Sequence, residues 1–265
     1  MTARIALGVT YDGSYFCGWQ SQADGVGVQD AMESAIAKIA GHTVRIHAAG
    51  RTDAGVHALR QVVHFDADPE RPMSAWLRGV NAFLPPSVRV TWAQEVPPEF
   101  HARFSAVSRS YQYLLYNAPV ASAIMHQKSG WFHLPLDVVA MQKASKFLLG
   151  EHDFSAFRAS ECQAKSPVKT MQIASVTRQG AYIKFCFSAN AFLQHQVRNM
   201  VGALIYVGKG ALQPQDMQNL LQQKDRTLSP PTFSSHGLYL TEVGYEEKWG
   251  LPKDKIGADI MNWVI

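Results

Sequence analysis

The residues of this chain best suited to chemistry stand together at 49–58, which read Ala-Gly-Arg-Thr-Asp-Ala-Gly-Val-His-Ala. This stretch lies between two strand-like runs, so we expect a loop that carries the single carboxylate of Asp53. Gly50 and Gly55 permit the positive φ angles of a tight connection, and Arg51 nearby favours an ionised carboxylate at neutral pH. Such an aspartate is either a reactive group or a turn residue that only hydrogen-bonds its own backbone.

A second candidate is a segment in which arginines alternate with aromatic residues. Arg103 precedes Phe104, and Arg109 precedes Tyr111 and Tyr113. Guanidinium groups pair with phosphates while aromatic rings stack on bases, the combination that binds single-stranded nucleic acid. A half-buried strand with core tyrosines and solvated arginines gives the same pattern, so both interpretations stay open.

A third candidate is an arginine beside the apolar stripe of a predicted helix, residues 194–207. The stripe consists of Val197, Val201, Leu204 and Ile205. Arg198 lies next to it, three residues after His195, and is expected to be partly buried. A buried guanidinium requires a carboxylate or several carbonyls, so its partner is either Asp53 or another acid in a structural ion pair.

Other parts of the chain bear on cofactors and on charge. The basic residues Arg158 and Lys165 fall in a long loop, 157–170, that suits contact with a polyanion or simple mobility. Walker A, dinucleotide-binding, metalloprotease and deaminase motifs are all absent from the sequence. The ten histidines show no ligand spacing, so we expect neither a metal nor an organic cofactor.

The composition indicates a folded intracellular protein. Of 265 residues, 47% are hydrophobic, and the net charge of +4 suits an anionic partner without requiring one. The three cysteines form no C-x-x-C pattern, which favours a reducing compartment. No apolar run is long enough for a signal peptide or a membrane span, so the expected location is the cytoplasm.

The hydrophobic periodicity predicts a β-α-β-β-α-β order twice. In residues 1–98 we expect strands at 4–11, 43–47, 61–65 and 88–96, and helices at 28–40 and 74–83. In residues 99–265 we expect strands at 109–116, 172–177, 182–187 and 238–245, and helices at 137–149, 194–207 and 215–222. The predicted fold is α+β: two ferredoxin-like halves form one long, mostly antiparallel sheet with helices on one face and a central active-site cleft.

Residues 50–58 closely resemble the signature of the tRNA pseudouridine synthase A family. Further segments resemble the family in the same order: Tyr11-Asp12-Gly13, Gly18-Trp19-Gln20, residues 100–104, Arg109 with Tyr111 and Tyr113, residues 152–154, residues 197–202 and residues 237–240. The resemblance extends from Ile5 to about Tyr245. Gln194 and Gln196 depart from the apolar or aromatic residues that the family often has there, which puts the local packing in question.

The resemblance implies an isomerase that converts uridine to pseudouridine at positions 38–40 of the tRNA anticodon stem-loop, as a homodimer and without a cofactor. It implies that Asp53 is the catalytic nucleophile and Arg198 its basic partner. Tyr111 would pack on the target base, and Arg51 would help to displace the uridine from the stack. We expect Arg51, Arg103, Arg158 and Lys165 to contact RNA phosphates.

Two other functions compete with this expectation. The ferredoxin-like unit is also that of the RNA-recognition motif, so an RNA-binding module without activity is the main alternative. An aspartate-dependent nucleosidase would break the same glycosidic bond and release the base.

Overall fold

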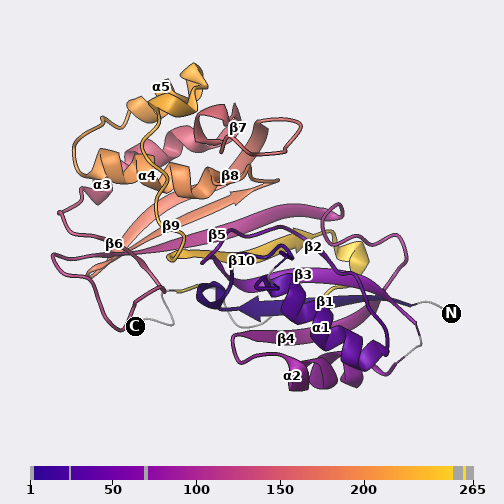
Figure 1. Cartoon of the computed structure of the whole chain (residues 1–265). Helices are drawn as coiled ribbons and strands as arrows, with labels where there is room; N and C mark the ends of the chain where they lie inside the picture. Colours follow the sequence, from indigo (N-terminus) through magenta and orange to yellow (C-terminus); the bar gives the residue numbers. More distant parts are fainter. Residues whose placement is uncertain (1–2, 24, 69–70, 253–258, 261–265) are drawn as a thin grey trace. The chain divides into compact units, whose positions relative to one another are not determined.

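The computed structural model describes residues 3–23, 25–68, 71–252 and 259–260, and its elements are labelled in Figure 1. The chain divides into two compact units. The first comprises Met1–Val107 and Tyr239–Ala258, and the second comprises Ser108–Leu238 and Asp259–Ile265. The first unit is therefore built from two separate parts of the sequence.

The first unit contains a mixed, mostly antiparallel sheet centred on β1. Its strands are β1 (Ala3–Tyr11), β2 (His47–Ala48), β3 (His57–Ala67), β4 (Val88–Val96) and β10 (Leu238–Tyr245). Strand β1 lies between β4 and β3 and is antiparallel to both. Strand β2 pairs with β3 near His64, while β10 runs parallel to the beginning of β3, where Tyr239 lies opposite His57.

The helices of the first unit pack against this sheet. They are α1 (Val28–Ala40), the π-helical turn η2 (Ala75–Gly79) and α2 (Val80–Phe83), and Figure 1 shows α1 beside α2. Helix α1 ends at Gly41, whose φ of 81° is a left-handed cap that favours glycine. Trp76 contacts Phe65 of β3 edge to face, with ring centroids 5.2 Å apart. This contact joins the second helical segment to the core of the sheet.

The second unit has its own antiparallel strands, in the order β5-β9-β8-β7. Its strands are β5 (Ala106–Asn117), β6 (Gly130–Phe132), β7 (Gly150–Asp153), β8 (Val168–Gln179) and β9 (Tyr182–Ala189). The short β6 pairs in parallel with the end of β5. The apolar side chains of β9, such as Phe185 and Phe187, are buried. Strand β9 is therefore the centre of this unit.

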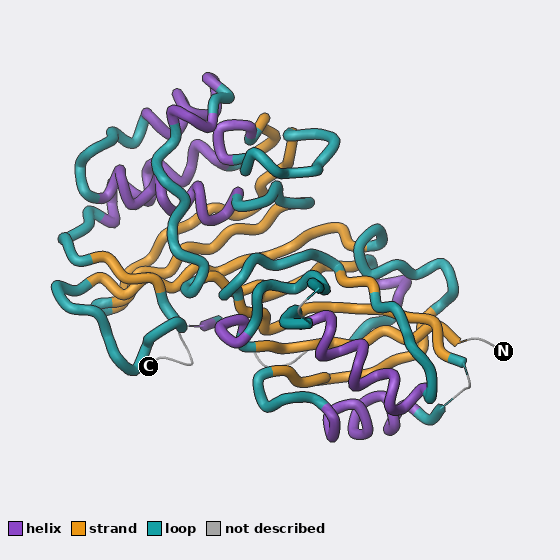
Figure 2. The backbone as a smooth tube through the Cα atoms, in the orientation of Figure 1, coloured by secondary structure: helices purple, strands orange, loops and turns teal. Residues whose placement is uncertain are grey.

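Three helices lie on one side of β8 and β9 (Figure 2): α3 (Val138–Ser145), α4 (Gln196–Gly208) and α5 (Asp216–Gln223). Gln142 of α3 donates from Nε2 to the carbonyl of Val176 on β8, at 2.9 Å. A Cβ at Gly208 would lie 2.8 Å from the sulfur of Met141, so α3 and α4 approach closely at this glycine. No helix of the described residues is both long enough and apolar enough to cross a membrane.

These observations confirm an α+β fold with mostly antiparallel strands, and they correct some predicted elements. Helix α1 and strands β4 and β10 have the predicted bounds. The predicted strand 43–47 is wrong except for its last residue, because the N–H of Ile46 donates to Glu33 Oε1 (3.1 Å) instead of to a strand. Strands β6 and β7 were not predicted. The joining of two ferredoxin-like halves around a central cleft stays a prediction.

The compact units have other bounds than the predicted halves, since residues 99–107 and 239–258 cluster with the first unit, and the division into two ferredoxin-like halves stays a prediction. We name residues 97–105 the connector. Its backbone is held by side chains of the first unit: Arg4 donates to the carbonyl of Phe100 (3.1 Å), and Tyr245 donates to the carbonyl of Ala102 (2.6 Å). The N–H of Ala102 donates to His64 Nδ1 at 3.1 Å. These bonds explain why the first unit continues beyond residue 98.

Candidate functional site

The loop at 49–56, between β2 and β3, is anchored on both sides of its arginine and aspartate. The Thr52 hydroxyl is 2.8 Å from the Tyr11 hydroxyl, and the Thr52 carbonyl accepts the N–H of Trp19 at 2.9 Å. Because these bonds hold Thr52 in the interior, its neighbours face the other way: Arg51 is exposed and Asp53 is half-buried. The loop therefore presents both predicted site residues from a fixed backbone.

A glutamine in β3 also supports this loop. Gln61 is fully buried, and its Nε2 donates to the carbonyl of Gly50 at 2.8 Å. Sequence reasoning missed this residue. The available signal was a polar side chain at the start of an otherwise apolar strand run, since a buried amide requires hydrogen-bond partners.

Glycines allow other segments to approach the loop closely. Gly55 has a φ of 78°, and the N–H of Val56 closes a turn onto the carbonyl of Asp53 at 3.1 Å. A Cβ at Gly13 would lie 1.9 Å from the carbonyl oxygen of Val56. At Gly18, where φ is 95°, a Cβ would lie 2.9 Å from the carbonyl oxygen of Thr52. Residues 13–18 therefore support the Asp53 loop directly, which accounts for two glycines near the N-terminus.

Tyr11 holds the loop as a neutral hydrogen-bonding group. Burial raises the pKa of Tyr11 to about 12, although hydrogen bonds from Thr52 and Gln61 oppose this. Its ring also contacts that of Trp19, with centroids 5.8 Å apart. At neutral pH the hydroxyl keeps its proton, so Tyr11 serves to position Thr52.

In the second unit, Tyr111 lies on β5 with its ring largely enclosed. It is 9% exposed, lies opposite Phe187 on β9, and meets the ring of Phe192 edge to face at 5.2 Å. Tyr113, two residues further along the same strand, is fully buried between Phe185 and Phe233. Tyr113 is thus a core residue, whereas Tyr111 retains a small accessible surface at the same face of the strand.

Arg198 lies in the first turn of α4 and is half-buried, as predicted. Its Nε donates to the carbonyl of Phe233 at 2.9 Å, and the N–H of Phe233 donates back to the carbonyl of Arg198 at 3.3 Å. These bonds fix the guanidinium stem against residue 233. The predicted pairing of Arg198 with Asp53 stays a prediction.

The residue before this helix adopts an unusual backbone conformation. His195 has a φ of 62°, in the left-handed region that non-glycine residues seldom adopt. Gln196 is fully buried, and its Oε1 accepts the N–H of Leu193 at 2.8 Å. Its Nε2 has no hydrogen-bond partner in the described part of the chain. Gln196, whose packing was in question from the sequence, is therefore enclosed at the beginning of a helix where the backbone of His195 is strained.

A buried asparagine in α4 forms a network that sequence reasoning missed. Asn199 Nδ2 donates to the carbonyl of Phe157 at 2.8 Å. Its Oδ1 accepts from the Thr232 hydroxyl at 2.6 Å and from Arg226 Nη2 at 3.2 Å. One amide thus joins three segments that are far apart in sequence, around the turn of helix that carries Arg198. No local pattern marks such a long-range network.

The residues predicted to contact RNA phosphates differ in exposure. Arg51, Arg103 and Lys165 are exposed. Arg158 is half-buried, and its Nη2 donates to the carbonyls of Cys162 and Ala164 at 2.5 and 3.0 Å. Arg158 therefore stabilises its own loop, and fewer of its N–H groups are available to a ligand.

The predicted site residues fall into two sets, each described within its own unit. Arg51 and Asp53 share one anchored loop of the first unit, and Tyr111 and Arg198 lie on β5 and α4 of the second. Within the described ranges, no group of three or more His, Cys, Asp or Glu residues could hold a metal ion. The arrangement offers a carboxylate, guanidinium groups and an enclosed aromatic ring, which are groups for acid–base or nucleophilic chemistry on a nucleic acid.

Comparison with known proteins shows consistent similarity. A family model described as "tRNA pseudouridine synthase" matches residues 8–105 and 144–246. The tRNA pseudouridine synthase A of Methylobacillus flagellatus is 64% identical over 249 residues, which are 94% of this chain and 95% of that protein. Proteins of the same name from Chromobacterium violaceum and Dechloromonas aromatica are 60% and 57% identical, again over 94% of this chain and 95% of each relative.

Proposed function

This chain belongs to the tRNA pseudouridine synthase family and is an isomerase of that class; we propose that Asp53 is its catalytic nucleophile and that its target uridines are at positions 38–40 of the tRNA anticodon stem-loop. We further propose that its two units are ferredoxin-like halves around a central cleft.

One observation supports this proposal more strongly than the others. The loop that contains Asp53 is held by buried polar groups, Thr52 and Gln61, while Asp53 itself stays half-buried at its surface. A simple turn requires no such support, whereas a reacting group must be held in a fixed position. The chemistry of the loop and its rigid attachment therefore favour a reactive aspartate over a turn residue.

The reaction requires one bond to be exchanged for another without any change in oxidation state. The N1–C1′ bond of uridine breaks, the uracil turns while it is still held, and C5 bonds to C1′. The C5 proton then leaves, and N1 gains a proton, so the product is an isomer of the substrate. A carboxylate such as Asp53 can attack C1′ or C6, or remove the C2′ proton to begin a glycal route.

The other predicted residues have roles that follow from their chemistry. Arg198 supplies positive charge that stabilises the Asp53 carboxylate, and the hydrogen bonds to residue 233 fix the direction of its stem. Tyr111 holds the freed uracil by stacking, for which its small exposed surface on β5 is sufficient. The exposed Arg51 occupies the gap that the flipped uridine leaves in the stem.

The same proposal includes the partners and the place of action. The substrate is tRNA, bound through its anticodon arm with phosphate contacts from the exposed Arg103 and Lys165. We propose a homodimer, because two copies of a chain of this size offer more contact area to an extended tRNA. The enzyme is expected to act in the cytoplasm and without a cofactor. Sedimentation that shows a monomer at working concentration would contradict the dimer.

The substitution Asp53→Asn tests the catalytic role. It keeps the size of the side chain but removes its charge and nucleophilicity, so tritium release from C5-labelled uridine in tRNA should become undetectable. Binding of tRNA in a filter assay should stay within a few-fold of wild type, because affinity is distributed over many basic residues. The matched control is Asp68→Asn, a change of the same kind at an exposed aspartate after β3.

Near wild-type tritium release from Asp53→Asn would remove Asp53 from its role. If wild-type protein bound an unmodified tRNA transcript tightly but released no tritium, an RNA-binding module would be favoured. Free uracil as the product would indicate a nucleosidase. Mapping pseudouridine in the transcript before and after incubation tests the predicted positions.

A further inference from the structure

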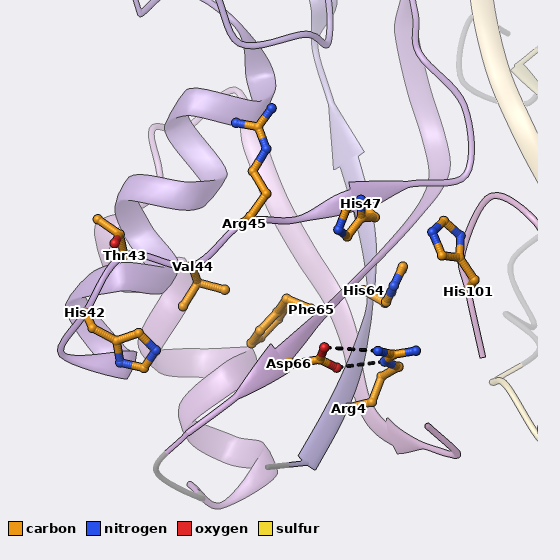
Figure 3. A pocket seen from close by; sticks show the side chains of 10 residues that line it. All are labelled: Arg4, His42, Thr43, Val44, Arg45, His47, His64, Phe65, Asp66 and His101. Carbon is orange, nitrogen blue, oxygen red and sulfur yellow. Dashed lines mark hydrogen bonds and ion pairs between the residues drawn. The ribbon is translucent and has the colours of Figure 1, made fainter. Parts of the chain in front are cut away.

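A second site in the first unit is formed by three histidines that come from separate parts of the chain (Figure 3). His47 lies in β2, His64 in β3, and His101 in the connector. Their ring centroids are 5.1 Å apart for His47 and His64, 4.5 Å for His64 and His101, and 5.5 Å for His47 and His101. They line a cavity of about 350 Å³ together with Arg4, Arg45 and Asp66, which we name the histidine pocket.

The histidine pocket lies at the opposite end of β3 from the Asp53 loop. His57 begins β3 just after that loop, and His64 is seven residues further along the same strand. At the rise of a β-strand, seven residues span roughly 23 Å. A group bound in the pocket is therefore not the reacting uridine.

Hydrogen bonds determine which ring nitrogens are available. His64 Nδ1 accepts the N–H of Ala102 at 3.1 Å, and His101 Nδ1 accepts the N–H of Arg103 at 3.1 Å. Each neutral ring therefore carries its proton on Nε2, where it is a donor. Both rings thus offer an N–H group to a ligand.

The electrostatics keep these two rings neutral. Burial is the main cause that lowers the pKa of His64 to about 4, and the rings of His101 and His47, when they are protonated, and the guanidinium of Arg4 lower it further. Burial also lowers the pKa of His101, with contributions from His47 and Arg4. Asp66 opposes this effect on His64. The two rings therefore act as uncharged donors around neutral pH.

The carboxylates near the histidine pocket are already paired. Asp66 accepts two hydrogen bonds from Arg4, at 2.7 and 3.0 Å, as Figure 3 shows. Glu33 lies 3.5 Å from Arg45, and its Oε1 also accepts the N–H of Ile46. Arg45 keeps a side chain that is 59% exposed, so its guanidinium has further donors for a ligand. The polar lining is therefore rich in donors, which fits an anionic oxygen ligand better than a cation.

The surroundings of the histidine pocket favour a nucleotide as the source of that anion. Phe104, in the connector, is 76% exposed, and its ring contacts that of His101 with centroids 4.3 Å apart. Arg103 lies over the Phe104 ring, 5.7 Å from its centroid. An exposed aromatic ring with a guanidinium beside it is a surface on which bases stack.

We propose that the histidine pocket binds a phosphate group of the tRNA backbone, through N–H groups of His64 and His101 and the guanidinium of Arg45, with the exposed His47 at its edge. This inference rests on the tRNA substrate of the proposed function. It adds a binding site that is remote from the reacting uridine. This site would recognise the phosphate by its charge and not by base sequence.

The double variant Arg45→Gln/His47→Gln tests this site at two exposed positions. Loss of one phosphate contact should lower the slope of log affinity against log salt by about 0.7–0.9, and weaken tRNA binding about fivefold at 0.15 M salt. The matched control is Lys38→Gln/His133→Gln, which removes an exposed cation and an exposed histidine that do not line the pocket. Arg45→Glu, which adds a carboxylate at the pocket, should weaken binding further than Arg45→Gln does.

Equal salt slopes for the pocket variant and the control would overturn the proposal, as would weaker binding with an unchanged slope. A second measurement follows the histidine ring resonances of wild-type protein by NMR. The resonances of His64 and His101 should shift when an anticodon stem-loop RNA is added. A shift with inorganic phosphate but none with the RNA would assign the pocket to a free anion and reject the tRNA backbone. Tritium release by wild type tests the proposed activity independently of both results.

Discussion

The Asp53 loop and the connector are both irregular segments of the first unit held by side chain–backbone hydrogen bonds, but their anchors differ in kind. The loop is held by neutral groups, the Tyr11 hydroxyl and the Gln61 amide. The connector is held by the neutral Tyr245 hydroxyl, by Arg4, which also pairs with Asp66, and by the His64 ring, which gains a proton as the pH falls toward 4. A hydroxyl or an amide keeps its hydrogen bond as the pH falls, whereas Nδ1 of His64 cannot accept a hydrogen bond once the ring is protonated. The anchors of the Asp53 loop are thus less sensitive to acid than the His64 anchor of the connector.

The largest expected effect comes from the packing of the loop. In Gly13→Ala the new Cβ would lie 1.9 Å from the carbonyl oxygen of Val56, so the backbone must move. We expect a loss of about 3 kcal/mol in the free energy of unfolding, the upper end of overpacking effects, and little remaining tritium release. Urea denaturation measures the first quantity.

The control for this change is Gly41→Ala. Gly41 has a φ of 81°, but a Cβ at this residue would have nothing within 4 Å of it, so only backbone strain is added. It should cost about 1 kcal/mol and leave tritium release unchanged. Equal losses from the two substitutions would show that close approach to the loop is unimportant.

The second prediction concerns pH and sharpens the contrast between the two anchors. The pKa of His64 is about 4 in the folded protein and near 6.5 when unfolded, so the unfolded state binds this proton first. Stability from the neutral ring is fully present above pH 6.5 and is lost as the pH falls toward 4, with a slope approaching about 1.4 kcal/mol per pH unit.

Urea denaturation between pH 7 and 4 measures this slope. The variant His64→Gln replaces the imidazole with a neutral amide that does not titrate, so its stability should depend less on pH over the same window. The charged groups that face His64 are His47, His101, Arg4 and Asp66, and they are the same in both proteins. Identical pH profiles for the variant and wild type would contradict the assignment of His64 as the titrating anchor.

The smallest expected effect compares two tyrosine hydroxyls. Tyr11→Phe removes the bond to Thr52 in the loop, and Tyr245→Phe removes the bond to the Ala102 carbonyl in the connector. Each should cost about 1 kcal/mol of stability. Tyr11→Phe should reduce tritium release at saturating tRNA more than Tyr245→Phe does, and Tyr245→Phe should weaken tRNA binding more. The opposite order would contradict the assignment of the Asp53 loop to catalysis and of the connector to tRNA binding.

The features that could be predicted from the sequence depend on residues that are close together in the chain. The bounds of α1 followed from its apolar spacing and Gly41, and the Asp53 loop followed from two glycines around one carboxylate. The histidine pocket could not be predicted, because His47, His64 and His101 show no common spacing and meet only when the connector lies against β3. Asn199 was missed for the same reason, since its partners are more than 25 residues away in the chain.

The discontinuity of the first unit has a consequence for how the protein is made. Its last strand, β10, pairs with the start of β3, where Tyr239 stacks on His57, and Tyr245 then bonds to the connector. During synthesis the ribosome delivers residues 108–238, which make up most of the second unit, before these residues emerge. The strand beside His57, immediately after the Asp53 loop, is therefore added only when translation is almost complete, so a nascent chain lacks this strand next to the Asp53 loop.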